Sequence, residues 1–130
     1  MKNNVVIVIF LMLSYCETFT QNLNSEKQLH SNWEFQKKGD KKWYMATVPG
    51  CVHTDLMDNG ILKDPYYRLN ESKAQWVDKE DWVYKSTFSL KENEYKKQHH
   101  EIKFEGLDTY ASVYLNDSLI LQSNNMHRTY

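Results

Sequence analysis

Short stretches in which apolar and polar residues alternate, separated by turn-forming residues, constrain this chain more than any other feature. Residues 110–115 alternate strictly, which is the period of a half-buried β-strand. Asn116-Asp117 comes next and is typical of a tight hairpin turn. Residues 118–122 are then expected to form the return strand.

The same alternation predicts further strands on either side of a long irregular segment. They are expected at 33–35, 43–48, 81–90 and around 102–104. Pro49-Gly50 ends the second of these strands, since proline presets the first turn torsion and glycine tolerates a left-handed one. Short strands joined by turns predict a mostly antiparallel β-sandwich or jelly roll.

One short helix is expected near 52–59. Its apolar residues fall on one face, as in an amphipathic helix. Thr54 and Asp55 lie early in the segment, where side-chain oxygens can cap free backbone amides. Asn59-Gly60 provides a left-handed exit.

The amino-terminal residues have the pattern of a secretory signal peptide. Lys2 precedes nine consecutive apolar residues at 5–13, and small or polar residues follow. Nine residues are too few to cross a bilayer, which takes roughly 20. We therefore expect a signal peptide at 1–20, with a buried first strand and lipidation of Cys16 as alternatives. Residues 21–32 are expected to be a polar leader, and 33–130 a partial β-sandwich domain.

Export follows from this interpretation: the protein would be periplasmic or secreted, or lysosomal in a eukaryotic host. Sixteen Lys and Arg residues against 17 Asp and Glu give a net charge of −1, which gives no reason to expect nucleic acid as a partner. No motif predicts a metal site or a cofactor. Cys51, the single thiol after signal removal, is expected to be a small buried hydrophobe.

The segment 61–80 has no sustained period, and a segment of that length is usually a functional or packed loop. No pairing of its carboxylates is evident, so no catalytic residue is assigned. Its aromatic, cationic and acidic side chains suit a sugar, whose C–H faces pack on rings and whose hydroxyls bind polar groups. The candidates for substrate binding, or for an interface with another domain, are Tyr66, Tyr67, Arg68, Trp76, Asp78 and Trp82. The alternative is that these rings fill the core.

Several motifs occur in order along 33–130. They include VPGCVHTDL at 48–56, DPYYR at 64–68 and FEGLDTYA at 104–111, with shorter pieces at 76–77, 81–84 and 113–116. Together they resemble the amino-terminal, sugar-binding-like jelly-roll domain of β-mannosidases in glycoside hydrolase family 2. The first two motifs point to the β-mannosidase branch of this family.

The resemblance implies an exo-acting, retaining enzyme that removes β-linked mannose from non-reducing ends of an oligosaccharide or glycan. In that family both catalytic glutamates lie in a later (β/α)-barrel, so the chain is expected to stop before that barrel and to hold an incomplete jelly roll. The barrel domain would be its partner. The alternatives are another family 2 glycosidase (a β-galactosidase, β-glucuronidase or exo-glucosaminidase) or a stand-alone carbohydrate-binding sandwich.

Overall fold

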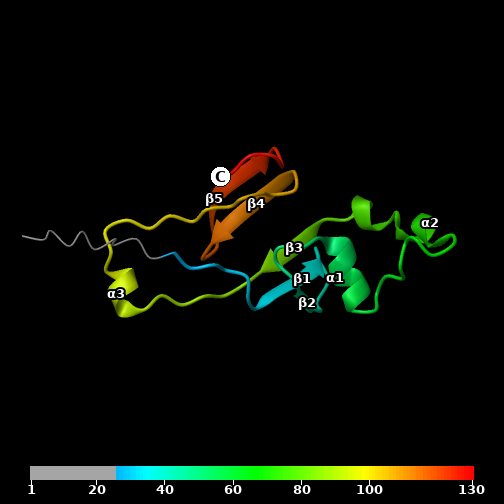
Figure 1. Ribbon diagram of the computed structural model, residues 1–130, viewed down its shortest axis with the longest axis horizontal. Helices are drawn as coiled ribbons and strands as arrows, with labels where there is room; N and C mark the ends of the chain where they lie inside the picture. Colours follow the sequence, from blue (N-terminus) through cyan, green and yellow to red (C-terminus); the bar gives the residue numbers. More distant parts are fainter. Residues whose placement is uncertain (1–25) are drawn as a thin grey trace, which may run out of the picture. The chain divides into compact units, whose positions relative to one another are not determined.

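The computed structural model describes residues 26–130, which form two compact units: one ends at Thr87 and the other is Phe88–Tyr130. Each unit contains antiparallel strands and short helical segments (Figure 1). The predicted signal peptide and Cys16 lie outside the described residues. The expectation of a mostly antiparallel β-structure is confirmed.

The first unit is built on an antiparallel sheet with the strand order β2-β1-β3. Its strands are β1 (Trp33–Lys37), β2 (Tyr44–Ala46) and β3 (Trp82–Lys85). Phe35, in the central strand, pairs with Tyr44 on one side and Tyr84 on the other. Residues paired across a sheet share a face, so three aromatic rings meet on one side of this sheet.

Phe35 is the centre of the core of this unit. Its side chain is fully buried, and its ring centroid lies 5.9 Å from Tyr44, 5.9 Å from Trp82 and 5.6 Å from Tyr84. These separations are typical of favourable aromatic pairs. The alternation of the strand residues thus determines which face of the sheet carries the core.

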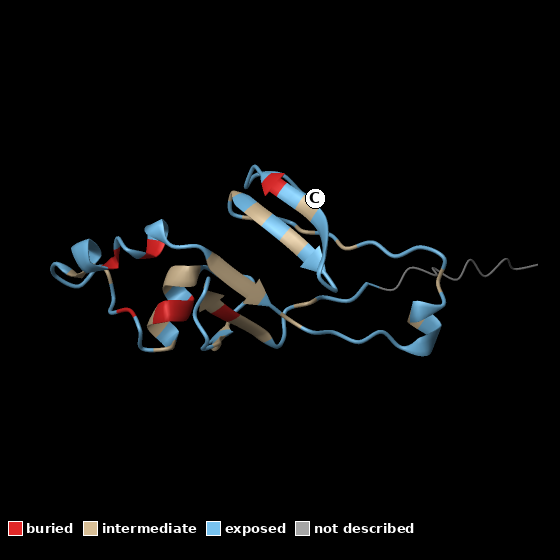
Figure 2. Cartoon of the chain, turned by 180° about the vertical axis from the view of Figure 1, so that it is seen from behind, coloured by how far each residue is buried: buried red, intermediate tan, exposed pale blue. Residues whose placement is uncertain are grey.

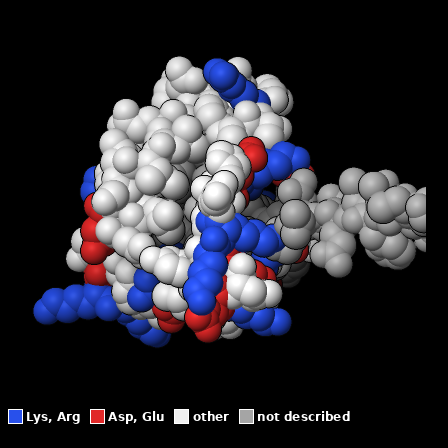
Figure 3. Space-filling view, turned by 90° about the vertical axis from the view of Figure 1, so that its left-hand side faces the viewer, with Lys and Arg blue, Asp and Glu red and all other residues white. Residues whose placement is uncertain are grey.

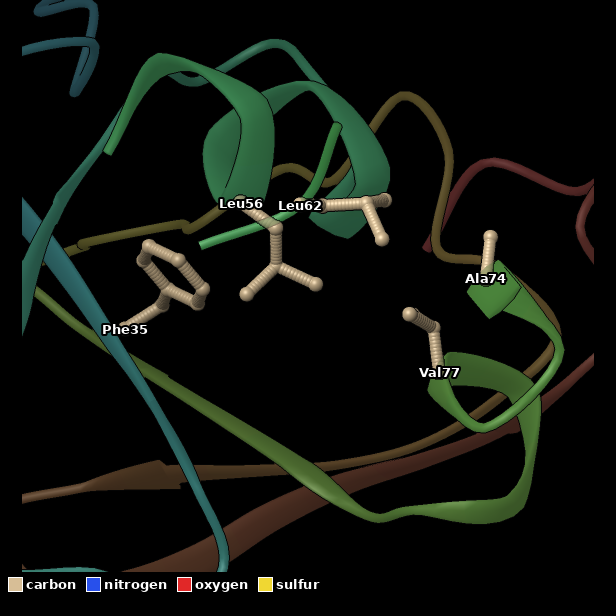
Figure 4. Packing of buried hydrophobic residues seen from close by; sticks show 5 residues of the cluster. All are labelled: Phe35, Leu56, Leu62, Ala74 and Val77. Carbon is tan, nitrogen blue, oxygen red and sulfur yellow. The ribbon is translucent and has the colours of Figure 1, made fainter. Parts of the chain in front are cut away.

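Helix α1 (Val52–Asp58), which the sequence predicts near 52–59, packs against this face. Leu56 is buried beside Phe35, and the cluster is completed by residues that follow the helix (Figure 4). The cluster consists of Phe35, Leu56, Leu62, Ala74 and Val77. Figure 2 shows that the buried positions of this unit gather around α1 and the segment after it.

The turn before α1 differs from the prediction. The Val48–Pro49 peptide bond is cis, and Gly50 is not among the residues with a positive φ. Gly50 is needed for space instead, because a Cβ there would lie 2.3 Å from the carbonyl oxygen of Thr47. The predicted exit at Gly60 is confirmed, with φ at 69°.

Three short helical segments were not expected from the sequence. They are α2 (Asn70–Ala74), the 3-10 helix η1 (Val77–Lys79) and α3 (Glu92–Tyr95). Ala74 and Val77 are buried, and their burial stabilises α2 and η1. Tertiary packing therefore accounts for these two segments, for which the sequence shows no sustained period. Strand β3 is also shorter than predicted, and Phe88 and Leu90 beyond it are exposed.

The second unit contains the hairpin of β4 (Tyr110–Leu115) and β5 (Ser118–Asn124). Its turn residues Asn116 and Asp117 have φ of 48° and 64°, as a type I′ turn requires. The predicted hairpin is therefore confirmed. The expected strand around 102–104 is not formed: Phe104 exchanges two backbone hydrogen bonds with Tyr130 and continues no ladder within the described residues.

Candidate carbohydrate-binding loop

The loop between α1 and β3 is anchored at its beginning by the end of the helix. The backbone amides of Ile61 and Leu62 both donate to the carbonyl oxygen of Leu56, at 2.9 and 3.1 Å. These bonds turn Leu62 back into the core, where it is buried. The loop thus leaves the helix at a fixed point.

A tight turn then displays the first group of predicted residues. Asp64 accepts hydrogen bonds from the backbone amides of Tyr66 (2.9 Å, at Oδ1) and Tyr67 (3.2 Å, at the carbonyl oxygen). Tyr66 is 97% and Tyr67 58% exposed, so both rings face solvent. The guanidinium of Arg68 lies 5.1 Å from the Tyr67 ring centroid, within cation–π range.

The second group lies against the sheet. The Trp76 ring packs on Trp82 with centroids 5.8 Å apart, and Trp82 Nε1 donates to the Val77 carbonyl oxygen at 3.0 Å. Asp78 Oδ1 is 3.7 Å from His53 Nε2 on α1. Trp82 also packs against the core, as the alternative interpretation of the aromatic residues expects.

The structure therefore brings the six predicted residues together as two groups. Within the part of the chain that the structure describes, no hydrogen bond or ring contact joins the turn at 66–68 to the Trp76–Trp82 pair. The same loop forms a small pocket of about 190 Å³ that sequence reasoning missed, and Trp76 is the one predicted residue in its lining. Its lining consists of Ile61, Leu62, Lys63, Asn70, Lys73 and Trp76.

Asp55 has a different role from the predicted helix cap. It is 1% exposed, its Oδ1 accepts from the Thr47 amide at 2.8 Å and its Oδ2 accepts from the Tyr84 hydroxyl at 2.8 Å. Burial raises the pKa of the Tyr84 phenol, and the hydrogen bond to Asp55 raises this pKa further. Asp55 is thus a structural carboxylate that holds Thr47 and Tyr84.

Cys51 is exposed rather than buried, contrary to the prediction. It is the N-cap of α1, and its Sγ lies 3.5 Å from Thr54 Oγ1. Hydrogen bonding with Thr54 lowers the pKa of the Cys51 thiol. Thr54 Oγ1 accepts a hydrogen bond from the Cys51 backbone amide at 3.4 Å, so it caps an amide as predicted, and it also donates to the Cys51 carbonyl oxygen at 2.7 Å.

On the face shown in Figure 3, basic and acidic side chains lie beside one another, and a broad area carries neither. Among residues 26–130, no three His, Cys, Asp or Glu side chains are close enough to hold a metal ion. In the same residues no helix has the length and apolar character to cross a bilayer.

The strands form antiparallel sheets, and the loop between α1 and β3 presents aromatic side chains to solvent. Residues 33–130 match the family described as glycosyl hydrolase 2 galactose-binding domain-like, and the chain belongs to this family. The galactose-binding-like sandwich expected from the sequence is thereby confirmed.

The chain is similar to β-mannosidases over most of its length. It is 33% identical to the β-mannosidase of Bos taurus over 126 residues, which are 97% of this chain and 14% of that protein. It is 40% identical to β-mannosidase B of Emericella nidulans over 112 residues, 83% of this chain and 13% of that protein. A crystal structure of β-D-mannosidase from Dictyoglomus thermophilum matches with a TM-score of 0.77 and 44% identity, over 78% of this chain and 13% of that chain.

These figures confirm the resemblance to the amino-terminal domain of family 2 β-mannosidases. They also show that the chain spans about one seventh of the length of the curated relatives it matches.

Proposed function

We propose that this chain is the amino-terminal part of an exported, exo-acting, retaining β-mannosidase that removes terminal β-D-mannose from non-reducing ends. The observation that carries the proposal is that the relatives above are all named β-mannosidases and match 78–97% of the chain. The motifs at 48–56 and 64–68 favour this activity over that of a β-galactosidase, β-glucuronidase or exo-glucosaminidase.

In this proposal the reacting carboxylates lie outside residues 26–130. A retaining glycosidase needs two carboxyl groups about 5–5.5 Å apart beside the scissile bond. Among the described residues Asp55 is the one buried carboxylate, and the Thr47 amide and the Tyr84 hydroxyl occupy both of its oxygens. The role of this domain is then to form a wall beside a barrel domain, with Tyr66 and Tyr67 facing the glycan.

A substrate panel tests the proposal on the longer protein that contains this chain. We expect release of p-nitrophenol from the β-mannoside, at a kcat/KM well above that for the β-galactoside and β-glucuronide. Proton NMR of the first product is expected to show the β-anomer, as retention requires. A preference for another glycoside would support a sister activity, and inactivity on the whole panel would support a binding module.

A further inference from the structure

The loop pocket has an unbalanced charge. Its lining holds two ammonium groups, of Lys63 and Lys73, and no carboxylate. Neither lysine is among those that form ion pairs within residues 26–130. Two uncompensated positive charges beside one cavity attract an anion.

Asp64, the acidic residue next to Lys63, does not line the pocket and does not neutralise its positive charge. Asp64, next to Lys63, directs Oδ1 to the backbone amide of Tyr66 at 2.9 Å. The Asp64 carbonyl oxygen accepts from Asn70 Nδ2 at 3.0 Å. This bond fixes the Asn70 amide in the lining and leaves its oxygen without a hydrogen bond among the described residues.

The remaining lining suits one sugar ring. Trp76 is 36% exposed, and its contact with Trp82 holds the indole in place. Ile61 and Leu62 add apolar surface. The volume of about 190 Å³ is below the roughly 300 Å³ at which pockets for drug-sized ligands begin. The occupant is thus a single small unit.

We infer that this pocket binds one anionic monosaccharide unit, a hexuronate. Its carboxylate meets Lys63 and Lys73, its ring packs on Trp76, and a hydroxyl donates to Asn70. This site goes beyond the proposed hydrolysis, because it recognises an acidic unit and not the mannose that is released. It would direct the protein to glycans that carry uronic acids.

Titration of the longer protein that contains this chain tests the inference. The probes are methyl β-D-glucuronide, methyl β-D-mannoside and inorganic phosphate, followed by calorimetry and tryptophan fluorescence. We expect saturable binding of the glucuronide, with an affinity about tenfold above those for the other two probes. Added salt is expected to weaken it, since the lysines are exposed and screened.

Variants of the lining residues test whether the glucuronide binds in this pocket. Lys63→Gln with Lys73→Gln is expected to weaken glucuronide binding about tenfold, as loss of charge-assisted hydrogen bonds does. Lys79→Gln is the matched control, because Lys79 is an exposed lysine of the same segment that does not line the pocket. Trp76→Leu is expected to weaken binding and to remove the fluorescence change. Lys63, Lys73 and Lys79 are exposed, so the fold is retained in the lysine variants. Circular dichroism checks the fold of Trp76→Leu, because Trp76 packs on Trp82.

Four results would each overturn the inference. They are absence of glucuronide binding at millimolar concentration, equal binding of the mannoside, equal binding of phosphate, and binding unchanged in the double lysine variant. The last result would place the glucuronide in another site, such as that of a glucuronidase. Activity on the β-mannoside does not enter this test, so failure of the proposed function is distinguished from failure of the pocket.

Discussion

The Tyr84 hydroxyl donates a hydrogen bond of 2.8 Å to Asp55 Oδ2 and thereby joins strand β3 to helix α1. The other Asp55 oxygen holds the Thr47 amide at the end of β2. One buried carboxylate thus connects the helix to both outer strands of the sheet.

Asp55→Ala is expected to destabilise the first unit strongly, because it leaves the Thr47 amide and the Tyr84 hydroxyl without this partner. The cost is about 2–4 kcal/mol for two lost acceptors. Tyr84→Phe removes one hydrogen bond and is expected to cost about 1 kcal/mol. Hydrogen exchange of peptides from β1 to β3 measures both changes locally, and equal effects of the two variants would contradict the bridging role.

Alkaline pH is expected to weaken this unit through Tyr84. The fold raises the pKa of the phenol above its ordinary value of 10, so the folded state keeps a proton that the unfolded chain loses. Stability is therefore full below pH 10 and falls as the pH rises, by at most about 1.4 kcal/mol per pH unit for one group. Urea titrations at pH 9 and 11 measure the fall, and Tyr84→Phe is expected to reduce it. An equal loss of stability in Tyr84→Phe would show that other groups cause the dependence on pH.

Gly50→Ala is expected to destabilise the protein, because the new Cβ would lie 2.3 Å from a backbone oxygen. Overpacking of this kind costs about 1–3 kcal/mol. Gly106→Ala is the control, since its Cβ would meet the Met126 carbonyl oxygen at an ordinary 3.6 Å. Thermal melts compare the two variants, and a larger loss in Gly106→Ala would refute the steric argument.

Tyr66→Ala with Tyr67→Ala is expected to lower kcat/KM on β-mannan oligosaccharides about tenfold, because stacked rings contribute roughly 0.5–1.5 kcal/mol each. Tyr95→Ala removes an equally solvent-facing ring, 73% exposed, outside the loop, and is expected to leave kcat/KM unchanged. An equal loss of kcat/KM in Tyr95→Ala and in the double variant would show that the loop has no special role.

The parts of the fold that were predictable are those fixed by local sequence. Asn116-Asp117 specifies its own turn, and alternation specifies the strand before it, so β4 matches the expected bounds. Segments α2 and η1 depend on burying Ala74 and Val77 against distant residues, which no local period records.

The sequence predicts which residue types the candidate loop contains, but it does not predict how their side chains are arranged. The number of aromatic side chains between 66 and 82 marked the segment. Its division into an exposed turn and a packed Trp pair follows from the hydrogen bonds of Asp64 and the core contacts of Trp82. Asp55 was misassigned for the same reason, since its partners Thr47 and Tyr84 are distant in sequence.

Hydrolysis of p-nitrophenyl β-D-mannoside is the most direct test of the central claim. The assay compares this 130-residue chain with the longer protein that contains it, at equal molar concentration. We predict p-nitrophenol release by the longer protein and none by the chain itself. Hydrolysis by the chain alone would contradict the claim that the reacting carboxylates lie outside it.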